Sequence, residues 1–280
     1  MTFSKLQKVA ITSTGICLGL SAGLDLLNAP SAHALSSQQL SQAANAIQYI
    51  RGKGCRVTTE NSAFKIICST KVVANMVQPE LDASQIKLYN SRGKSYARFK
   101  VGRNGNQQTT RISNVYYNPR GPLNLKIMPD NVNSRKIQMR GTRNGFQFIT
   151  SFESSGTEFE VQDKYFGNWC DRCFPDVHWN QGKITANLQL TPNMRLSSNP
   201  QIAVNGQWML RGNLDVIPDQ RVNTSLSNSM STLLSQNAGR VNSLVTGQLN
   251  NLARRLPNNI RNNISYSFSN GNISVRVPVR

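Results

Sequence analysis

The chain has 280 residues, of which 38% are hydrophobic, and its 32 Lys and Arg residues against 13 Asp and Glu residues give a net charge of +19. A chain of this length can bury one large hydrophobic core or two smaller ones. So strong a positive charge favours a polyanionic partner. Beyond residue 34 no apolar run approaches the ~20 residues of a membrane-spanning helix, which argues against a membrane-embedded domain.

The first 34 residues have the pattern of a secretory signal peptide. A basic start precedes an apolar or small-residue segment at 9–24, and residues 25–34 end in Ala32-His33-Ala34. The A-x-A ending predicts cleavage after Ala34, and the apolar segment is too short for a membrane anchor. We therefore expect the mature protein, residues 35–280, to be exported to the periplasm or the extracellular space.

Charge is distributed unevenly along the mature chain. Residues 84–150 hold 13 basic side chains and one acid, residues 151–179 hold six acids and two bases, and residues 180–280 hold ten bases and two acids. In an exported protein such a field predicts an anionic lipid, lipopolysaccharide or acidic polysaccharide as partner, with peripheral membrane contact, and not a nucleic acid. The alternative is a charged surface that only maintains solubility.

The first predicted elements are a helix and a hairpin. Apolar residues between Leu40 and Ile50 repeat at helical spacing, and glycines 52 and 54 end that helix. The stretch CRVTTENSAFKIIC, residues 55–68, predicts two strands with a turn near residues 60–62. Partners across a hairpin lie close enough for a disulfide, so we predict a bond between Cys55 and Cys68.

Short strands separated by turn residues fill the segment 85–161 and predict antiparallel pairing. The turns fall at 91–93, 104–105, 119–121 and 144–145, and the third strand is expected to run without interruption over 109–117. In YARFKV, residues 96–101, alternation buries Ala97, Phe99 and Val101 and exposes the basic residues between them. The predicted cationic binding face consists of Lys87, Arg92, Lys94, Arg98, Lys100, Arg103 and Arg111.

The stretch YFGNWCDRCFPDVHW, residues 165–179, admits three interpretations. A thioredoxin-type redox site needs its C-x-x-C at the start of a helix in a βαβ unit, and a strand follows here instead. A zinc knuckle would use Cys170, Cys173 and His178, but its fourth ligand position is Lys183, so no metal or other cofactor is expected. We predict a structural disulfide, Cys170–Cys173, that holds a loop against the tryptophans 169 and 179.

The acids of 151–179 are the one place where a catalytic site can be considered. A pair of carboxylates drawn from Glu153, Glu158, Glu160, Asp163, Asp171 and Asp176 would suit an enzyme acting on an anionic envelope substrate. His178 has no serine motif with which to form a triad. We expect these acids to balance local charge and assign no catalytic residue.

The last hundred residues contain the strongest periodic signals. Alternating strands at 183–190 and 207–216 precede a helical pattern from Pro218 and Asp219 to Leu256, about 55 Å long at 1.5 Å per residue. A hairpin with an Asn270-Gly271 turn closes the chain, and its register puts Phe268 opposite Ile273.

This order of elements, strands then one long amphipathic helix then a hairpin, resembles the half-barrel of the tubular lipid-binding (TULIP) proteins, such as bactericidal/permeability-increasing protein. The resemblance implies a curved antiparallel sheet around a long helix, with a groove for acyl chains.

The predicted fold is α+β, with curved antiparallel sheets, a short N-terminal helix and a long C-terminal helix. It forms a single elongated domain that has a possible sub-boundary near 162–182. The predicted function is non-catalytic binding of anionic lipids or envelope polyanions, and the alternatives are an envelope enzyme and a structural or adhesion protein.

Overall fold

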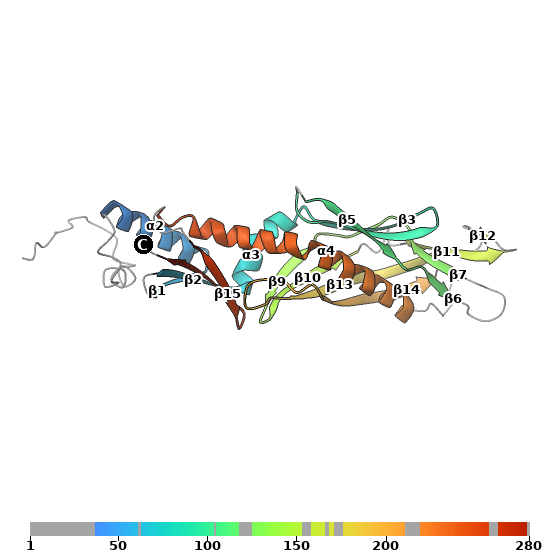
Figure 1. The fold of residues 1–280 in the computed structure, drawn as a ribbon. Coiled ribbons are helices and arrows are strands. Elements are labelled where there is room, and N and C mark those ends of the chain that lie inside the picture. The colour runs from blue at the N-terminus through green and yellow to red at the C-terminus, as the bar shows by residue number, and fades with distance from the viewer. Residues whose placement is uncertain are drawn as a thin grey trace, which may run out of the picture.

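A computed structural model describes residues 37–60, 63–103, 105–117, 125–152, 158–165, 168–170, 176–210, 219–257 and 263–278. These residues form an elongated α+β fold in which the long helix α4 follows the long axis (Figure 1). The elements in chain order are α2 (Ser37–Gly52), β1 (Arg56–Glu60), β2 (Ala63–Ser69), α3 (Thr70–Leu81), β3 (Gln85–Ser91), β4 (Lys94–Lys100), β5 (Gln107–Ile112), β6 (Val115–Tyr117), β7 (Leu125–Pro129), β8 (Val132–Asn133), β9 (Gln138–Thr142), β10 (Gly145–Ser151), β11 (Glu158–Tyr165), β12 (Asn168–Cys170), β13 (Val177–Gln189), β14 (Gln201–Leu210), α4 (Asp219–Ala253), β15 (Ser265–Ser269) and β16 (Asn272–Pro278). The predicted fold class is confirmed.

Three antiparallel sheets are present in the described part of the chain. One has the order β1-β2-β16-β15, a second has the order β5-β4-β3-β8, and the largest runs β6-β7-β11-β13-β10-β9 with β12 beside β11 and β14 beside β13. The strands predicted between 85 and 161 are therefore divided between two sheets. The predicted signal peptide with Ala32 and Ala34, the turns at 61–62 and 119–121, and Cys173 lie outside the described residues.

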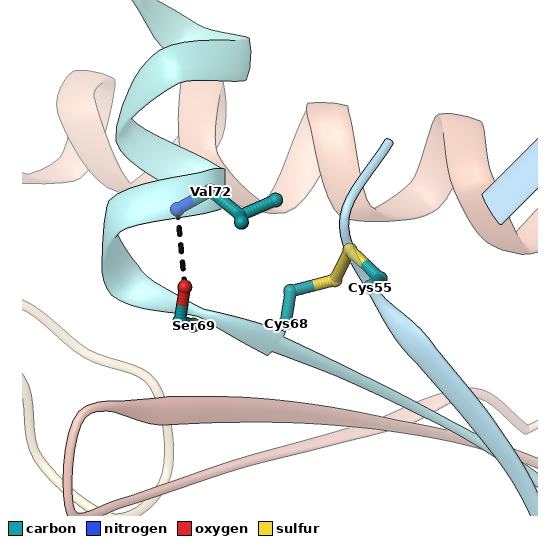
Figure 2. The surroundings of a disulfide bond; sticks show 4 residues. All are labelled: Cys55, Cys68, Ser69 and Val72. Atoms are coloured by element: carbon teal, nitrogen blue, oxygen red, sulfur yellow. Dashed lines mark hydrogen bonds between the residues drawn. A yellow bond between two sulfur atoms is a disulfide. The ribbon is translucent and has the colours of Figure 1, made fainter. Parts of the chain in front are cut away.

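The hairpins with the strongest turn signals are confirmed. Strands β15 and β16 turn at Asn270-Gly271, where both residues have positive φ angles (48° and 74°), and Phe268 pairs with Ile273 as predicted. Positive φ at both central residues is what a type I′ turn requires, and an Asn-Gly sequence adopts it at low cost. In β1–β2 the register places Arg56 opposite Ile67, so Cys55 and Cys68 are the next pair, and they form a disulfide with a Cα–Cα distance of 4.4 Å (Figure 2).

Helix α3 is the main element that sequence reasoning missed. It begins directly after β2, where Ser69 is the N-cap and its hydroxyl accepts a hydrogen bond of 3.3 Å from the N–H of Val72 (Figure 2). Its buried side chains include Val73, Val77 and Leu81, which recur at helical spacing. The helix ends two residues after Pro79, which lies in its last turn.

Three smaller corrections concern strand limits. The predicted strand 109–117 is two strands, because the chain passes from one sheet to another between β5 and β6. The turn between β9 and β10 is centred on Arg143-Asn144, not on Asn144-Gly145, since Thr142 pairs with Gly145. Strand β13 begins at Val177, six residues before the predicted start, and β14 begins at Gln201.

Helix α4 forms although serine, threonine and asparagine are poor helix formers. Several of its hydroxyls donate to the carbonyl one turn earlier, as Ser229 does to Ser225 and Thr246 does to Asn242, so these groups are satisfied within the helix. Its apolar stripe faces the sheets, and packing of that stripe supplies most of its stability. The buried apolar residues of α4 are Val222, Leu226, Met230, Leu233, Leu234, Val241, Val245, Leu249, Leu252 and Ala253.

The core of the largest sheet is organised around two stacked indoles. Trp179 on β13 and Trp208 on β14 are directly paired, with ring centroids 5.0 Å apart and planes 2° from parallel. The β-bulge after Asn180 brings Gly182 under the Trp179 ring, and Gly206, with φ of 137°, lies beside the same indole. A Cβ atom at Gly206 would lie 2.3 Å from Trp179 Nε1, so only glycine leaves room for this ring.

Candidate anion-binding face

The predicted cationic residues of β3, β4 and β5 lie on one side of their sheet. Ile86, Leu88, Ala97 and Phe99 are buried on the inner side, and the residues between them are part-exposed on the outer side. The pairing places Lys87 opposite Arg98, and Lys100 opposite Gln85 on one neighbour and Gln107 on the other. We call this outer side the basic face, and its cations are Lys87, Lys94, Arg98, Lys100 and Arg111.

Two tyrosines form the centre of the basic face. Tyr89 and Tyr96 are directly paired across β3 and β4, and their rings are 5.5 Å apart and nearly stacked. The Arg98 guanidinium lies 4.9 Å from the centroid of Tyr89 and donates a hydrogen bond of 3.3 Å to its hydroxyl. This cation–π contact holds the guanidinium against the sheet without neutralising its charge.

The basic face carries no compensating acid on its own strands. None of the residues of β3, β4, β5 or β8 is Asp or Glu, and no salt bridge formed within the described residues involves a cation of this face. Like charges held on neighbouring strands repel one another, so this side of the sheet concentrates positive potential. A polyanion in contact with it would relieve that repulsion.

The remaining predicted cations lie at the ends of these strands. Arg92 is in the β3–β4 turn with a φ of 51°, and Arg103 is exposed beyond the end of β4. Arg92 and Arg103 therefore extend the positive potential at the two ends of β4. Lys126 on β7 is buried and donates to Gln162, so it is not available to a partner in solution.

The tyrosine pair was missed because it depends on register. Both tyrosines belong to runs in which alternate residues face outward, but only the observed pairing of β3 with β4 brings them together. The Arg92-Gly93 turn, with φ of 51° and 70°, sets that register, and its sequence signal is present. Sequence reasoning that carried the register through that turn would have placed the two rings side by side.

The motif around Cys170 is only partly described. Cys170 lies on β12 and is disulfide-bonded. Cys173 lies outside the residues that the structure describes, so a bond between Cys170 and Cys173 stays a prediction. Trp169 is part-exposed and lies 5.8 Å from the ring of Tyr116, whereas Trp179 is fully buried. Among the described residues no three His, Cys, Asp or Glu side chains gather in a way that would hold a metal ion.

Among the candidate acids of 158–179, Glu160 has structural partners. Glu160 accepts hydrogen bonds from Asn90 on β3 and from Gln162, whose own carbonyl accepts from Lys126. This chain of side chains ties the sheet of β3 to the sheet of β7 and β11. Asp163 is buried, while Glu153 and Asp171 lie outside the described residues.

A TULIP-like groove is expected between α4 and the sheets, and within the described part of the chain side chains of α4 and the strands pack against each other there. One hollow lined there by described residues measures about 20 Å³, enough for roughly one water molecule. An acyl chain could enter at this place only if α4 moved away from the sheets. Side chains from both sheets and the helix line the hollow, among them Ile86, Phe99, Phe148, Ile184, Met230 and Leu234.

Comparison with known proteins leaves the chain without an assigned family. No family model matches it, and neither a curated protein nor a solved structure matches it. The resemblance to tubular lipid-binding proteins therefore stays a prediction from element order. Within the described residues, no helix has both the length and the apolar character needed to cross a membrane.

Proposed function

We propose that the protein is a non-catalytic binding protein that docks onto anionic lipid surfaces through its basic face. The observation that carries this proposal is the alignment of Lys87, Arg98, Lys100 and Arg111 on one side of an ordered sheet whose strands contain no acid. The inner side of the sheet is a packed core, so the backbone positions of the cations are fixed before any partner arrives, and less backbone entropy is lost on binding.

The expected strength follows from the number of charges. A basic residue close to an anionic membrane contributes about 1 kcal/mol, so four of them supply up to ~4 kcal/mol, or roughly three orders of magnitude in affinity. The Debye length falls from ~10 Å at 0.1 M salt to ~3 Å at 1 M, and binding should weaken over that range.

The test is flotation of the purified protein with vesicles of phosphatidylcholine alone or mixed with phosphatidylglycerol. We expect binding to the mixed vesicles only, with loss of binding at high salt. The double reversal Arg98→Glu/Lys100→Glu should weaken binding at low salt at least tenfold, because it removes two attractive charges and adds two repulsive ones.

A matched control separates the basic face from the overall charge. Lys183 on β13 and Arg276 on β16 are exposed cations on the other two sheets, so Lys183→Glu/Arg276→Glu changes the net charge equally. Equal loss in both double variants would show that net charge alone drives adsorption and would overturn the proposed role of the basic face. Binding to acidic polysaccharide but not to the mixed vesicles would move the proposal to a different partner.

A further inference from the structure

A second basic site lies where three helices meet, away from the strands of the basic face. A pocket of about 760 Å³ is lined by the end of α2, one side of α3 and the last turns of α4. Pockets that hold small ligands typically measure ~300–1,000 Å³, so this one has the size of a ligand site. Sequence reasoning did not indicate it, because one of its walls is the missed helix α3.

Three cations line the pocket, and no acid does. Lys53 follows the end of α2, and Arg254 and Arg255 follow the end of α4. Glu80, the acid nearest to the lining residues of α3 in sequence, is not part of the lining. Within the described residues, none of the three cations forms a salt bridge.

Two of these cations contact the ring of Tyr49. The Arg255 guanidinium lies 4.6 Å from the ring centroid and the Lys53 ammonium lies 5.5 Å from it. Each contact is attractive, but the two cations that share the ring repel each other. An anion within reach of both cations would offset that repulsion.

The helix dipoles balance only part of the positive charge of Lys53, Arg254 and Arg255. Cations at the C-terminal ends of α2 and α4 interact favourably with the helix dipoles, each equivalent to about half a negative charge. Two such ends offset about one of the three positive charges. About two positive charges are left without a partner inside a concave site.

The rest of the lining indicates what kind of anion fits. Asn75, Gln248 and Asn251 place side-chain amides at the pocket, and amide N–H groups donate hydrogen bonds to oxyanions. Val72, Met76 and Leu252 provide an apolar wall beside them. An inorganic ion would leave that wall in contact with water, whereas a molecule with both an oxyanion and an apolar chain would cover it.

We propose that this pocket binds an amphiphile whose phosphate group carries a net negative charge that no cation of its own headgroup balances. Arg254, Arg255 and Lys53 contact the phosphate, because guanidinium groups match its oxygens in bidentate geometry. The chain of the amphiphile lies against Val72, Met76 and Leu252. The site is independent of the basic face, and it takes single ligand molecules where the basic face takes an extended surface.

The proposal is tested by calorimetric titration of the purified protein with three probes. These are dihexanoyl phosphatidic acid and dihexanoyl phosphatidylcholine, both below the concentrations at which they form micelles, and inorganic phosphate. We expect one saturable site for the phosphatidic acid. Inorganic phosphate should bind more than tenfold more weakly, because each buried CH₂ group contributes roughly a factor of four.

Variants from two walls of the pocket provide separate tests. Arg254→Gln/Arg255→Gln and Lys53→Gln should each weaken phosphatidic acid binding about tenfold or more, since each removes a charge-assisted contact. Arg240→Gln is the matched control: it removes an exposed cation of the same helix that does not line the pocket, and it should bind like the unchanged protein. If the double variant fails to fold, Lys53→Gln alone decides.

Four outcomes would overturn the site: equal binding of the phosphatidylcholine, equal binding of inorganic phosphate, no saturable binding, or equal loss in Arg240→Gln. The variant Arg98→Glu/Lys100→Glu keeps the two proposals apart. It should retain phosphatidic acid binding while losing vesicle binding, and loss of both would show that the pocket does not act on its own.

Discussion

The disulfide between Cys55 and Cys68 offers the most quantitative test of how this fold is held together. Both sulfurs are buried, and the two residues are directly opposed across the β1–β2 hairpin. A Cα–Cα distance of 4.4 Å matches that of a close antiparallel pair, about 4.5 Å, so the hairpin accommodates the bond in its natural register. The perturbation is the double substitution Cys55→Ala/Cys68→Ala.

The expected loss comes mainly from the unfolded chain. A bond between residues 13 apart closes a short loop, and its loss restores conformational entropy worth about 3 kcal/mol at 25 °C. Removing two buried sulfur atoms also leaves small voids, which adds up to about 1 kcal/mol for each. For a chain of this size 1 kcal/mol corresponds to about 2–4 °C, so the melting temperature should fall by at least about 6 °C.

Urea and thermal melts of the unchanged protein and the variant, with and without reductant, measure this. Reductant also breaks the bond that involves Cys170, so its effect on the double variant reports that second bond alone. In the native protein, the buried Cys55–Cys68 bond should resist reductant until the chain unfolds. A variant within about 1 kcal/mol of the unchanged protein would refute the loop-entropy account.

Three further outcomes are expected. Gly206→Ala should lower the free energy of unfolding by about 3 kcal/mol or more and change the tryptophan fluorescence. The backbone φ of 137° is unfavourable for alanine, and the new Cβ atom would clash with Trp179. Unchanged fluorescence and stability would contradict this. Ser69→Ala should cost about 1 kcal/mol in urea melts through loss of the N-cap of α3, and Ser69→Thr should restore most of it. Hydrogen bonds from Gln78 and Lys136 lower the pKa of Asp82, so the stabilising effect of its carboxylate is present at neutral pH and is lost as the pH falls through that lowered pKa. The free energy of unfolding of the unchanged protein and of Asp82→Asn, measured against pH, should therefore differ less under acid conditions than at neutral pH. A difference that grows on acidification would contradict this.

What could be predicted from sequence was local. The register of β15–β16 follows from a two-residue turn, and the disulfide follows from a hairpin with a cysteine at each end. The side of β4 that carries Arg98 and Lys100 follows from alternation alone. In each case the signal lies within about fifteen residues.

What could not be predicted depends on contacts between distant segments. Helix α3 is held by the backbone of Gly271 and by Thr142, with which Thr70 forms hydrogen bonds, and neither contact has a sequence signature. The split of 109–117 into two strands depends on which sheet each half joins. The pocket combines residues near 50, 75 and 250, so it becomes visible only in three dimensions.

The pairing of β2 with β16 has a consequence for how the molecule is made. Ile66 pairs with Val275, so β2 receives this neighbour only after β16, about 200 residues further along the chain, has been synthesised. Until then one edge of the N-terminal hairpin has unpaired N–H and C=O groups, which favour aggregation. The β1–β2 hairpin and its disulfide can form as soon as they emerge, but the sheet closes last, and a chain interrupted within α4 would have no means of closing it. Loss of β16 should therefore harm assembly far more than loss of an edge strand would, because β16 lies between β2 and β15.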